Sequence, residues 1–206
     1  RILMAQSAPS IKKLALELGG NAPFIVFDDA DLDEAVAGAM ASKFRNMGQT
    51  CVCSNRFLVQ DGVYNAFAEK LKQAMAQLKL GSGFTPDTTQ GPLIDCNALD
   101  KVQRLVADAV QKGAKVLMGG QPSGLGGTYY EPTLLSDVQA TMQIAQEEVF
   151  GPVAPLFRFQ TEAQAVAMAN DTEFGLAAYF YARDIGRVWR VSGKLQYGKI
   201  GRASCR

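Results

Sequence analysis

Histidine is absent from all 206 residues of this chain. A serine or cysteine nucleophile paired with histidine, and any metal site with histidine ligands, is therefore excluded within this sequence. A general base has to be glutamate, aspartate, lysine or tyrosine. The absence directs the search for chemistry toward the carboxylates.

Cysteine, excess charge and long apolar runs are also scarce. Four cysteines in a chain of this size do not form a disulfide scaffold, which favours a reducing, intracellular setting. With 21 basic and 20 acidic side chains, the sequence lacks the charge excess that binds nucleic acid or an anionic membrane. No apolar run approaches the roughly 18 residues of a spanning helix, and the first residues lack signal-peptide organisation. We expect a cytoplasmic protein, with the mitochondrial matrix as the alternative.

The remaining composition describes an ordinary globular protein, with 48% hydrophobic and 20% charged residues. Short β-like runs alternate with amphipathic stretches. Strands are expected over residues 14–18, 23–27, 56–60, 115–118, 154–159 and 177–181, and helices from the acidic residues 28–31 to about 42 and over 63–78, 97–112 and 162–170. This alternation predicts an α/β fold with a largely parallel, twisted sheet.

The most informative run is Gly-Gln-Thr-Cys-Val-Cys at residues 48–53. Thiolate is the nucleophilic form of cysteine, and a small, flexible, polar run could present Cys51 in the exposed or polar setting that a thiolate needs. Most intracellular cysteines are small buried side chains, so this run alone leaves both interpretations open.

Two further segments decide between them. Glu-Leu-Gly-Gly-Asn-Ala-Pro lies upstream at residues 17–23, and Glu-Glu-Val-Phe-Gly-Pro lies downstream at residues 147–152. In this order, the three segments resemble the catalytic region of the NAD(P)-dependent aldehyde dehydrogenases. The longer stretch over residues 43–56 looks like the succinate-semialdehyde dehydrogenase branch in particular. The resemblance extends from about residue 1 to residue 198.

The resemblance implies an aldehyde-dehydrogenase-like catalytic domain that is truncated at both ends. Residues 1–22 would be the C-terminal remnant of a cofactor-binding domain, and residues 23–198 an incomplete catalytic domain. Residues 199–206 read like a translated sequencing adapter, so we predict a non-native tail and leave it out of the fold; a natural divergent tail is the alternative. The family further implies that the full-length protein is a homo-oligomer, either dimer or tetramer. The fragment alone is expected to lack activity.

By match to the family, Cys51 is the nucleophile. Its thiolate would add to an aldehyde to form a thiohemiacetal, which becomes a thioester once hydride passes to the nicotinamide. Glu17 matches the general base that activates water to hydrolyse that thioester. The alternative for Glu17 is a solvated carboxylate at the end of a strand.

Three more residues match cofactor contacts of the family. Leu18 would offer its backbone to the nicotinamide end, while Glu148 and Phe150 would hold the cofactor ribose. The alternative is that Glu148 is an ordinary loop acid and Phe150 a core side chain. Both NAD and NADP remain open, and no metal is expected.

Arg45, six residues before Cys51, matches the arginine that binds the far carboxylate of succinate semialdehyde. A guanidinium suits this role because its planar fork engages a carboxylate bidentately. The alternative is a surface charge at a helix end. The predicted reaction is therefore oxidation of succinate semialdehyde to succinate. Another aldehyde such as glutarate semialdehyde, and a non-catalytic binding or structural protein on the same scaffold, are the alternatives.

Cys51 and Cys53 also predict a redox switch. In an extended segment, their Cα atoms would lie about 6.6 Å apart, near the upper edge of the disulfide range of roughly 4.4–6.8 Å. A bridge would be strained, easily reduced and able to block the nucleophile. The alternative is that Cys53 is only a packed thiol.

Overall fold

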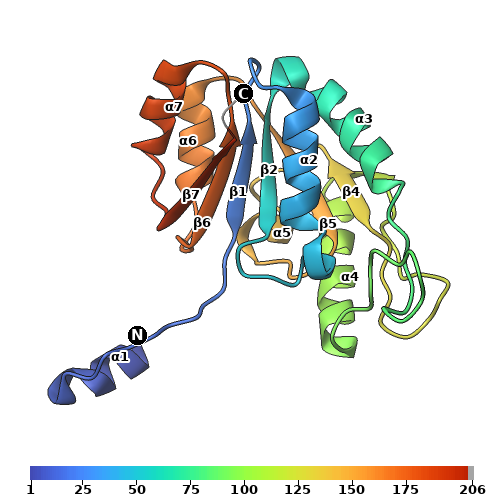
Figure 1. The fold of residues 1–206 in the computed structure, drawn as a ribbon, viewed down its shortest axis with the longest axis horizontal. Helices are drawn as coiled ribbons and strands as arrows, with labels where there is room; N and C mark the ends of the chain where they lie inside the picture. The colour runs from blue at the N-terminus through green and yellow to red at the C-terminus, as the bar shows by residue number, and fades with distance from the viewer. Residues whose placement is uncertain (204–206) are drawn as a thin grey trace.

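A seven-stranded sheet runs through the middle of the molecule in the computed structural model, which describes residues 1–203 (Figure 1). The strand order is β3-β4-β5-β2-β1-β6-β7. The strands are β1 (Ala22–Val26), β2 (Ser54–Gln60), β3 (Lys115–Met118), β4 (Thr133–Ser136), β5 (Val153–Phe159), β6 (Ala177–Tyr181) and β7 (Lys199–Ala203). Neighbouring strands are parallel except β3 and β4, which are antiparallel. The predicted α/β class and the largely parallel sheet are confirmed.

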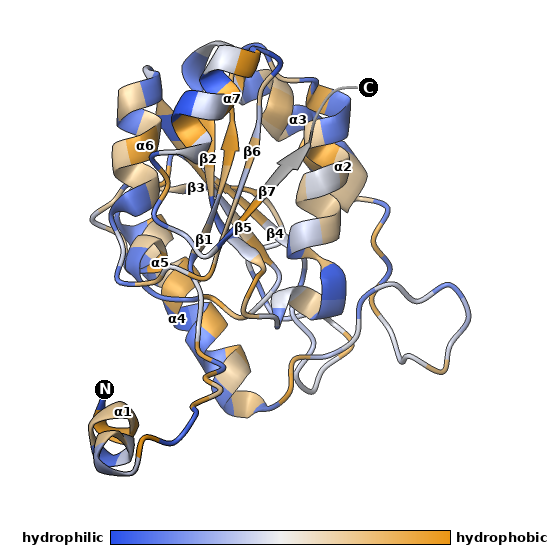
Figure 2. Ribbon diagram, turned by 60° about the vertical axis from the view of Figure 1, so that its left-hand side comes forward, coloured by the Kyte–Doolittle hydropathy of each residue, from blue (hydrophilic) through white to orange (hydrophobic). Residues whose placement is uncertain are grey.

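Helices cover both faces of this sheet. Side chains of α2 (Leu32–Lys43) and α3 (Tyr64–Met75) form one buried cluster with the strands. Side chains of α4 (Cys96–Gln111), α5 (Gln143–Gln146), α6 (Glu162–Asn170) and α7 (Ile185–Ser192) form the cluster on the other face. The remaining elements are α1 (Ile2–Ser7) and three short 3-10 turns, η1 (Ala8–Ser10), η2 (Arg45–Gly48) and η3 (Asp61–Val63). Figure 2 shows apolar strands between helices with mixed surfaces.

Strand β1 shows why the sheet needs both layers. Phe24 and Val26 pack with α2 and α3, whereas Ile25 between them packs in the opposite cluster. Successive side chains point to opposite faces, so a strand covered on both sides reads as a continuous apolar run. All five residues of β1 are buried.

Acidic side chains begin the helices as expected. Asp31 caps α2, because its carboxylate accepts hydrogen bonds from the backbone N–H groups of Asp33 at 3.1 Å and Glu34 at 3.3 Å. Such a cap satisfies donors that have no partner inside the helix. The predicted acidic start of this helix is confirmed.

Most predicted elements are present within a few residues of their expected bounds. The strands at 115–118 and 177–181 and the helix at 162–170 have the predicted limits. The strand predicted over residues 14–18 is wrong, since this segment has no regular structure and is exposed. The prediction also lacked β4 and α7.

The predicted tail is partly included in the sheet. Lys199–Ala203 pairs in parallel with β6, from Ala177 opposite Lys199 to Tyr181 opposite Ala203. Leaving these residues out of the fold was therefore wrong, and residues 204–206 lie outside the described part. Pairing of this kind uses backbone groups that almost any sequence supplies. That residues 199–206 are a non-native tail therefore stays a prediction.

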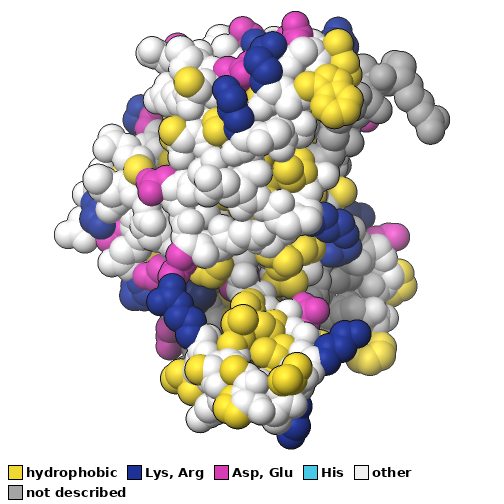
Figure 3. Space-filling model, turned by 90° about the vertical axis from the view of Figure 1, so that its left-hand side faces the viewer, with side chains coloured by type: hydrophobic (Ala, Val, Ile, Leu, Met, Phe, Trp, Pro, Cys, Tyr) yellow, Lys and Arg dark blue, Asp and Glu magenta, His cyan; other side chains and the backbone are white. Residues whose placement is uncertain are grey.

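The first 19 residues stand away from the sheet. Helix α1 and the irregular segment after it project from the body of the molecule (Figure 1). Ile2, Leu3 and Met4 are exposed, and Figure 3 shows the apolar side chains gathered on this helix. Burial begins at Gly20.

Among residues 1–203, no helix is both long and apolar enough to cross a membrane.

Candidate active site

The candidate site lies where four neighbouring parallel strands begin. Residues 17–21 precede β1, 48–53 precede β2, 147–152 precede β5 and 171–176 precede β6. These strands are adjacent in the order β5-β2-β1-β6 and parallel, so their amino ends share one edge of the sheet. The fold thereby brings the three sequence motifs together with a fourth segment.

Gly20 is the point at which the three motifs meet. Its backbone N–H donates a hydrogen bond to Glu148 Oε1 at 3.0 Å. A Cβ atom at this residue would lie 2.0 Å from the carbonyl oxygen of Cys51, so only glycine allows the two backbones to approach this closely. Gly20, three residues after Glu17, is thus fixed against both the cysteine loop and Glu148.

The cysteine loop is a turn, not an extended segment. The backbone N–H of Cys53 donates to the carbonyl of Thr50 at 2.9 Å. The extended geometry from which the spacing of the two Cα atoms was predicted is therefore wrong. Cys51 and Cys53 are both free thiols here, the first half-buried and the second buried. The redox switch itself stays a prediction.

Backbone strain marks the approach to this loop. Asn46, Met47 and Gly48 all have positive φ angles, of 51°, 59° and 74°. A buried methionine rarely adopts this conformation, which often accompanies functional sites. At Gly48 a Cβ atom would lie 2.2 Å from the carbonyl oxygen of Gly151, so the strained turn packs directly on the motif at 147–152.

Tyr179 supports the loop from β6, which is separated from β2 by β1 in the sheet, and no sequence motif marked this residue. Its hydroxyl donates a hydrogen bond to the carbonyl of Val52 at 2.9 Å. Burial raises the pKa of this phenol; nearby Cys53 and Cys51 raise it further, while Arg45 lowers it. The phenol therefore lies within electrostatic reach of both thiols and the guanidinium.

Glu17 and Leu18 line a cavity of about 540 Å³ together with Leu16, Gly19 and residues 173–176. This volume falls within the usual range for small-molecule sites, roughly 300–1,000 Å³. Glu17 is exposed on this cavity. Along the chain, Glu17 lies three residues before Gly20, the residue that contacts the Cys51 carbonyl.

The residues at the rim of this region fit a nucleotide cofactor. Glu148 is half-buried, and a Cβ atom at Gly19 would lie 2.8 Å from its Oε2. Its carboxylate therefore lies against the backbone that lines the cavity, with lone pairs left for ribose hydroxyls. Phe150 is 36% exposed, which makes its ring available to a ligand and contradicts a core position.

Arg45 lies exposed in η2. Among residues 1–203 it has no carboxylate within ion-pair distance, unlike Arg104, Arg158, Arg183, Arg187 and Arg190. Its guanidinium is therefore open to a carboxylate supplied by a ligand.

Lys43, at the end of α2, is buried completely and was not predicted as a site residue. Burial lowers the pKa of this lysine to about 8, against the opposing influence of Cys53 and Glu148. It falls within the stretch 43–56 that carries the resemblance, but nothing in the sequence distinguishes it from a solvated lysine.

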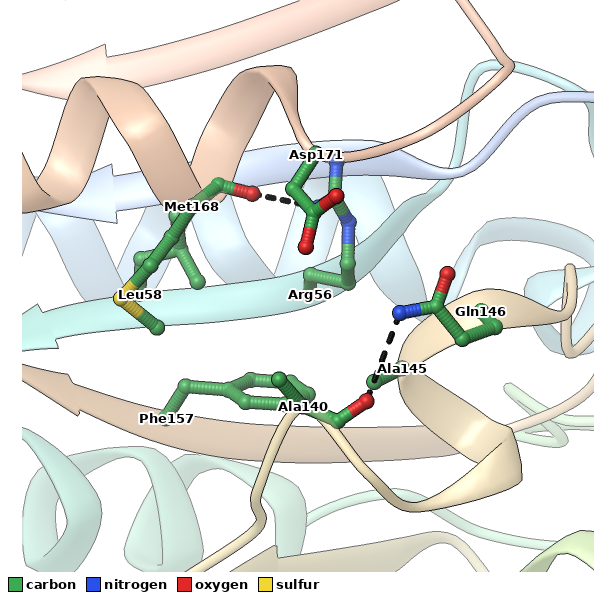
Figure 4. Close-up of a pocket in the computed structure, with 8 residues that line it drawn as sticks. All are labelled: Arg56, Leu58, Ala140, Ala145, Gln146, Phe157, Met168 and Asp171. Atoms are coloured by element: carbon green, nitrogen blue, oxygen red, sulfur yellow. Dashed lines mark hydrogen bonds between the residues drawn. The ribbon is translucent and has the colours of Figure 1, made fainter.

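A second, smaller cavity has a structural explanation. It measures about 30 Å³, room for little more than a water molecule or two. Figure 4 shows the guanidinium of Arg56 beside it, directed at the carbonyl of Met168 near the end of α6. Arg56 also donates to the carbonyls of Asn21 at 3.1 Å and Ala169 at 2.8 Å. Arg56 thus joins β2, the start of β1 and α6.

The described part of the chain contains no cluster of three or more cysteine, aspartate or glutamate side chains placed to hold a metal ion. The chemistry available at the site is therefore that of a thiol, carboxylates, a buried lysine and an open arginine.

Known proteins share both the sequence and the fold. The aldehyde dehydrogenase family model matches residues 1–203. The chain is 62% identical over 201 residues to a glutarate-semialdehyde dehydrogenase of Pseudomonas aeruginosa and, equally, to an NADP(+) succinate-semialdehyde dehydrogenase of Escherichia coli. The crystal structure of succinate-semialdehyde dehydrogenase from Burkholderia pseudomallei is 61% identical and superposes with a TM-score of 0.95.

Each of these three matches covers 98% of this chain and 42% of the relative. The chain thus spans less than half the length of the proteins it matches. The match reaches across all three motifs, the sheet and the helices on both of its faces. This chain belongs to the aldehyde dehydrogenase family, and its relatives include succinate- and glutarate-semialdehyde dehydrogenases.

Proposed function

We propose that the full-length protein oxidises succinate semialdehyde to succinate with NAD(P)⁺. The observation that carries the proposal is the meeting of three motifs at Gly20, whose N–H binds Glu148 and whose Cα lies against the Cys51 carbonyl. The segments that carry the proposed nucleophile, base and cofactor-binding carboxylate would thereby meet in one region. If the protein were instead a non-catalytic binding or structural protein on the same scaffold, there would be no chemical reason for it to keep the Cys51 thiol and the Glu17 carboxylate.

In the proposed mechanism Cys51 acts first. Its thiolate adds to the aldehyde carbon, a C–S bond forms, and the carbonyl oxygen becomes an alkoxide. The backbone N–H of Cys51 would donate to this alkoxide; loss of one such donor typically costs about 2.7–4 kcal/mol. The half-buried position of the side chain gives a small aldehyde access to the sulfur.

Glu17 acts in the second half of the reaction. A bound nicotinamide would accept the hydride that the substrate carbon loses. That carbon would then remain bonded to the Cys51 sulfur as a thioester. Glu17 then takes a proton from water, the water oxygen attacks the thioester carbon, and the C–S bond breaks to release the acid and the thiolate. General-base help of this kind contributes about 10²–10⁴-fold.

The cofactor would be held by Glu148 and Phe150 at the ribose and by the Leu18 backbone at the nicotinamide end. The E. coli relative is named for NADP(+), which favours that nucleotide. We also propose that the full-length protein assembles as a homo-oligomer, as the family implies.

Arg45 would select the substrate. Its open guanidinium suits the far carboxylate of a semialdehyde, whether four or five carbons long. Glutarate semialdehyde is therefore the second candidate substrate, favoured by the P. aeruginosa relative at 62% identity.

The test uses the full-length protein with succinate semialdehyde, glutarate semialdehyde and butanal as substrates. Cys51→Ala should lower kcat/KM for all three by at least roughly 10³-fold. Arg45→Ala should raise KM for the two semialdehydes by about 10²-fold and leave butanal nearly unchanged. An active Cys51→Ala protein would refute the mechanism, and equal effects of Arg45→Ala on all three substrates would refute its role.

A further inference from the structure

Lys43 is the most unusual charged residue of the described chain. It ends α2 with its side chain 0% exposed. Lysine is almost never fully buried without partners, because removing an ammonium group from water is costly. A structure that keeps a lysine there has to hold it by specific contacts.

Those contacts form a chain of hydrogen bonds toward the site. Lys43 Nζ donates to Asn55 Oδ1 at 3.1 Å, and both side chains are buried. Asn55 Nδ2 in turn donates to the carbonyl oxygen of Gly20 at 3.3 Å. An ammonium group donates and never accepts, so it fixes the amide of Asn55 with its oxygen toward Lys43 and its NH₂ toward Gly20.

Gly20 is therefore held on both sides of its backbone. Its carbonyl accepts from Asn55 and its N–H donates to Glu148, while its Cα touches the Cys51 backbone. Glu17 lies three residues upstream on the same strip of chain. The orientation of one buried amide is thus among the contacts that hold Gly20 against the cysteine loop.

Lys43 keeps its charge at neutral pH although burial lowers its pKa. Burial lowers the pKa of Lys43 to about 8, and the groups that oppose this effect are Cys53 of the cysteine loop and Glu148. At pH 7 the side chain is still mostly an ammonium, in which form its donors hold the amide in one orientation.

We infer that Lys43 is a positioning residue of this site: through Asn55 it holds the Gly20 peptide, and with it the strip that carries Glu17, against the cysteine loop. The catalytic consequence of this role rests on the proposed function, in which Glu17 is the general base for hydrolysis of the thioester. Loss of Lys43 should therefore slow hydrolysis and spare the addition of the thiol.

The experiment compares Lys43→Met and Asn55→Asp in the full-length protein, with Lys70→Met as the matched control. Asp at position 55 still accepts from Lys43 but has no N–H for the Gly20 carbonyl. Lys70 pairs with Asp33 on the surface, far along the chain from the site. The first readout is hydrogen exchange of the backbone amides in residues 17–23, followed by mass spectrometry; the second is stopped-flow formation of reduced cofactor.

Both site variants should exchange these amides at least roughly 10-fold faster than the wild type, while β2 and β5 stay protected. The initial burst of reduced cofactor should keep its rate and amplitude, whereas the steady-state rate falls roughly 10- to 100-fold. Lys70→Met should match the wild type in both readouts.

Unchanged exchange in residues 17–23 would overturn the inference. Equal losses of the burst of reduced cofactor and of the steady-state rate would also overturn it. Lys43 would then support the fold as a whole and not the hydrolysis step in particular. If Lys43→Met does not fold, Asn55→Asp decides by the same criteria. If the wild type oxidises no aldehyde, the proposed function fails, and the exchange result alone decides whether Lys43 holds the strip.

Discussion

At the scale of single residues, the cysteine loop is held by one tyrosine hydroxyl of β6. Tyr179 donates to the Val52 carbonyl, and its ring packs at 6.3 Å from Phe24. Tyr181, two residues along β6, also stacks on Phe24, at 5.1 Å. Among the described residues, the Tyr181 hydroxyl has no hydrogen-bond partner, which makes the two tyrosines a matched pair.

Tyr179→Phe should therefore lower the free energy of unfolding by about 1 kcal/mol, the usual net contribution of one hydrogen bond. The ring stays and only the donor to the Val52 carbonyl is lost. Tyr181→Phe is the control and should change stability less. Urea denaturation of the two variants measures the difference, and equal losses would show that the hydroxyl of Tyr179 does not hold the loop.

Lys43 makes stability depend on pH. Its pKa is lowered from 10.5 to about 8, so between these values the folded chain has released a proton that the unfolded chain still binds. The contribution of Lys43 to the free energy of unfolding should therefore rise as the pH rises through this window. The full change corresponds to roughly 3 kcal/mol.

Urea denaturation at pH 7.5 and pH 9.5 tests this dependence. The wild type should gain stability relative to Lys43→Met between the two pH values, because methionine has no proton to release. If the two proteins respond identically to pH, the lysine does not titrate in this window.

At the scale of elements, the site is built from connections that precede strands. Each connection is irregular, so its position comes from the strand that follows and from contacts with the other connections. The approach of residues 17–21 to the cysteine loop is the closest of these, with Gly20 against the Cys51 carbonyl. The edge where the strands begin thus owes its shape to glycines.

Gly20→Ala should push the two connections apart, because its Cβ atom would lie 2.0 Å from a backbone oxygen. We expect a loss of roughly 1–3 kcal/mol in the free energy of unfolding, the usual cost of overpacking. Gly62→Ala is the control, since a Cβ atom there would meet nothing within 4 Å; it should stay within about 0.5 kcal/mol. Denaturant titration of both variants checks the contrast.

The sequence pattern was sufficient to predict those elements whose own residues carry a clear hydrophobic pattern or a helix-capping signal. Helices α3 and α4 were predicted because their apolar residues recur at helical spacing along one face. Strand β1 was predicted from its short apolar run, and helix α2 from its acidic start. The predicted strand at 14–18 shows the limit of this reasoning. Leu14, Leu16 and Leu18 alternate as in a half-buried strand, yet all three are exposed, since no strand of the described chain pairs with them.

For the candidate site, the sequence identified the motifs but not how they meet in space. Cys51, Glu17 and Glu148 were identified from their order along the chain, whereas their meeting at Gly20 depends on the strand order β5-β2-β1-β6. Lys43 and Tyr179 were missed for the same reason. Their partners, Asn55 and Val52, become neighbours only when α2 and β6 pack on β2 and β1.

At the scale of the whole molecule, the chain divides into a buried body and an exposed arm. Residues 1–19 have few buried atoms, and the segment 11–19 has no regular structure. Segments of this kind open and are cut first by proteases, because little buried surface has to be exposed.

Brief trypsin treatment of this chain should therefore cut after Lys12 or Lys13 before any site between β1 and β6. The expected large product begins at residue 13 or 14, and intact-mass measurement identifies it. First cuts within α2 or α4 would show that the body is less stable than the arm, contrary to the burial in the structure.

The direction of the helices has an electrostatic consequence for the edge at which the site lies. Helices α2 and α6 lead into β2 and β6, so both end there and turn their carbonyl ends toward it. The end of a helix carries a partial negative charge that attracts cations. Lys43 in the last turn of α2 and Arg45 just beyond it supply them. The phosphates of a dinucleotide would be repelled by these two helix ends, and the groups that hold them should be sought in the remainder of the full-length protein.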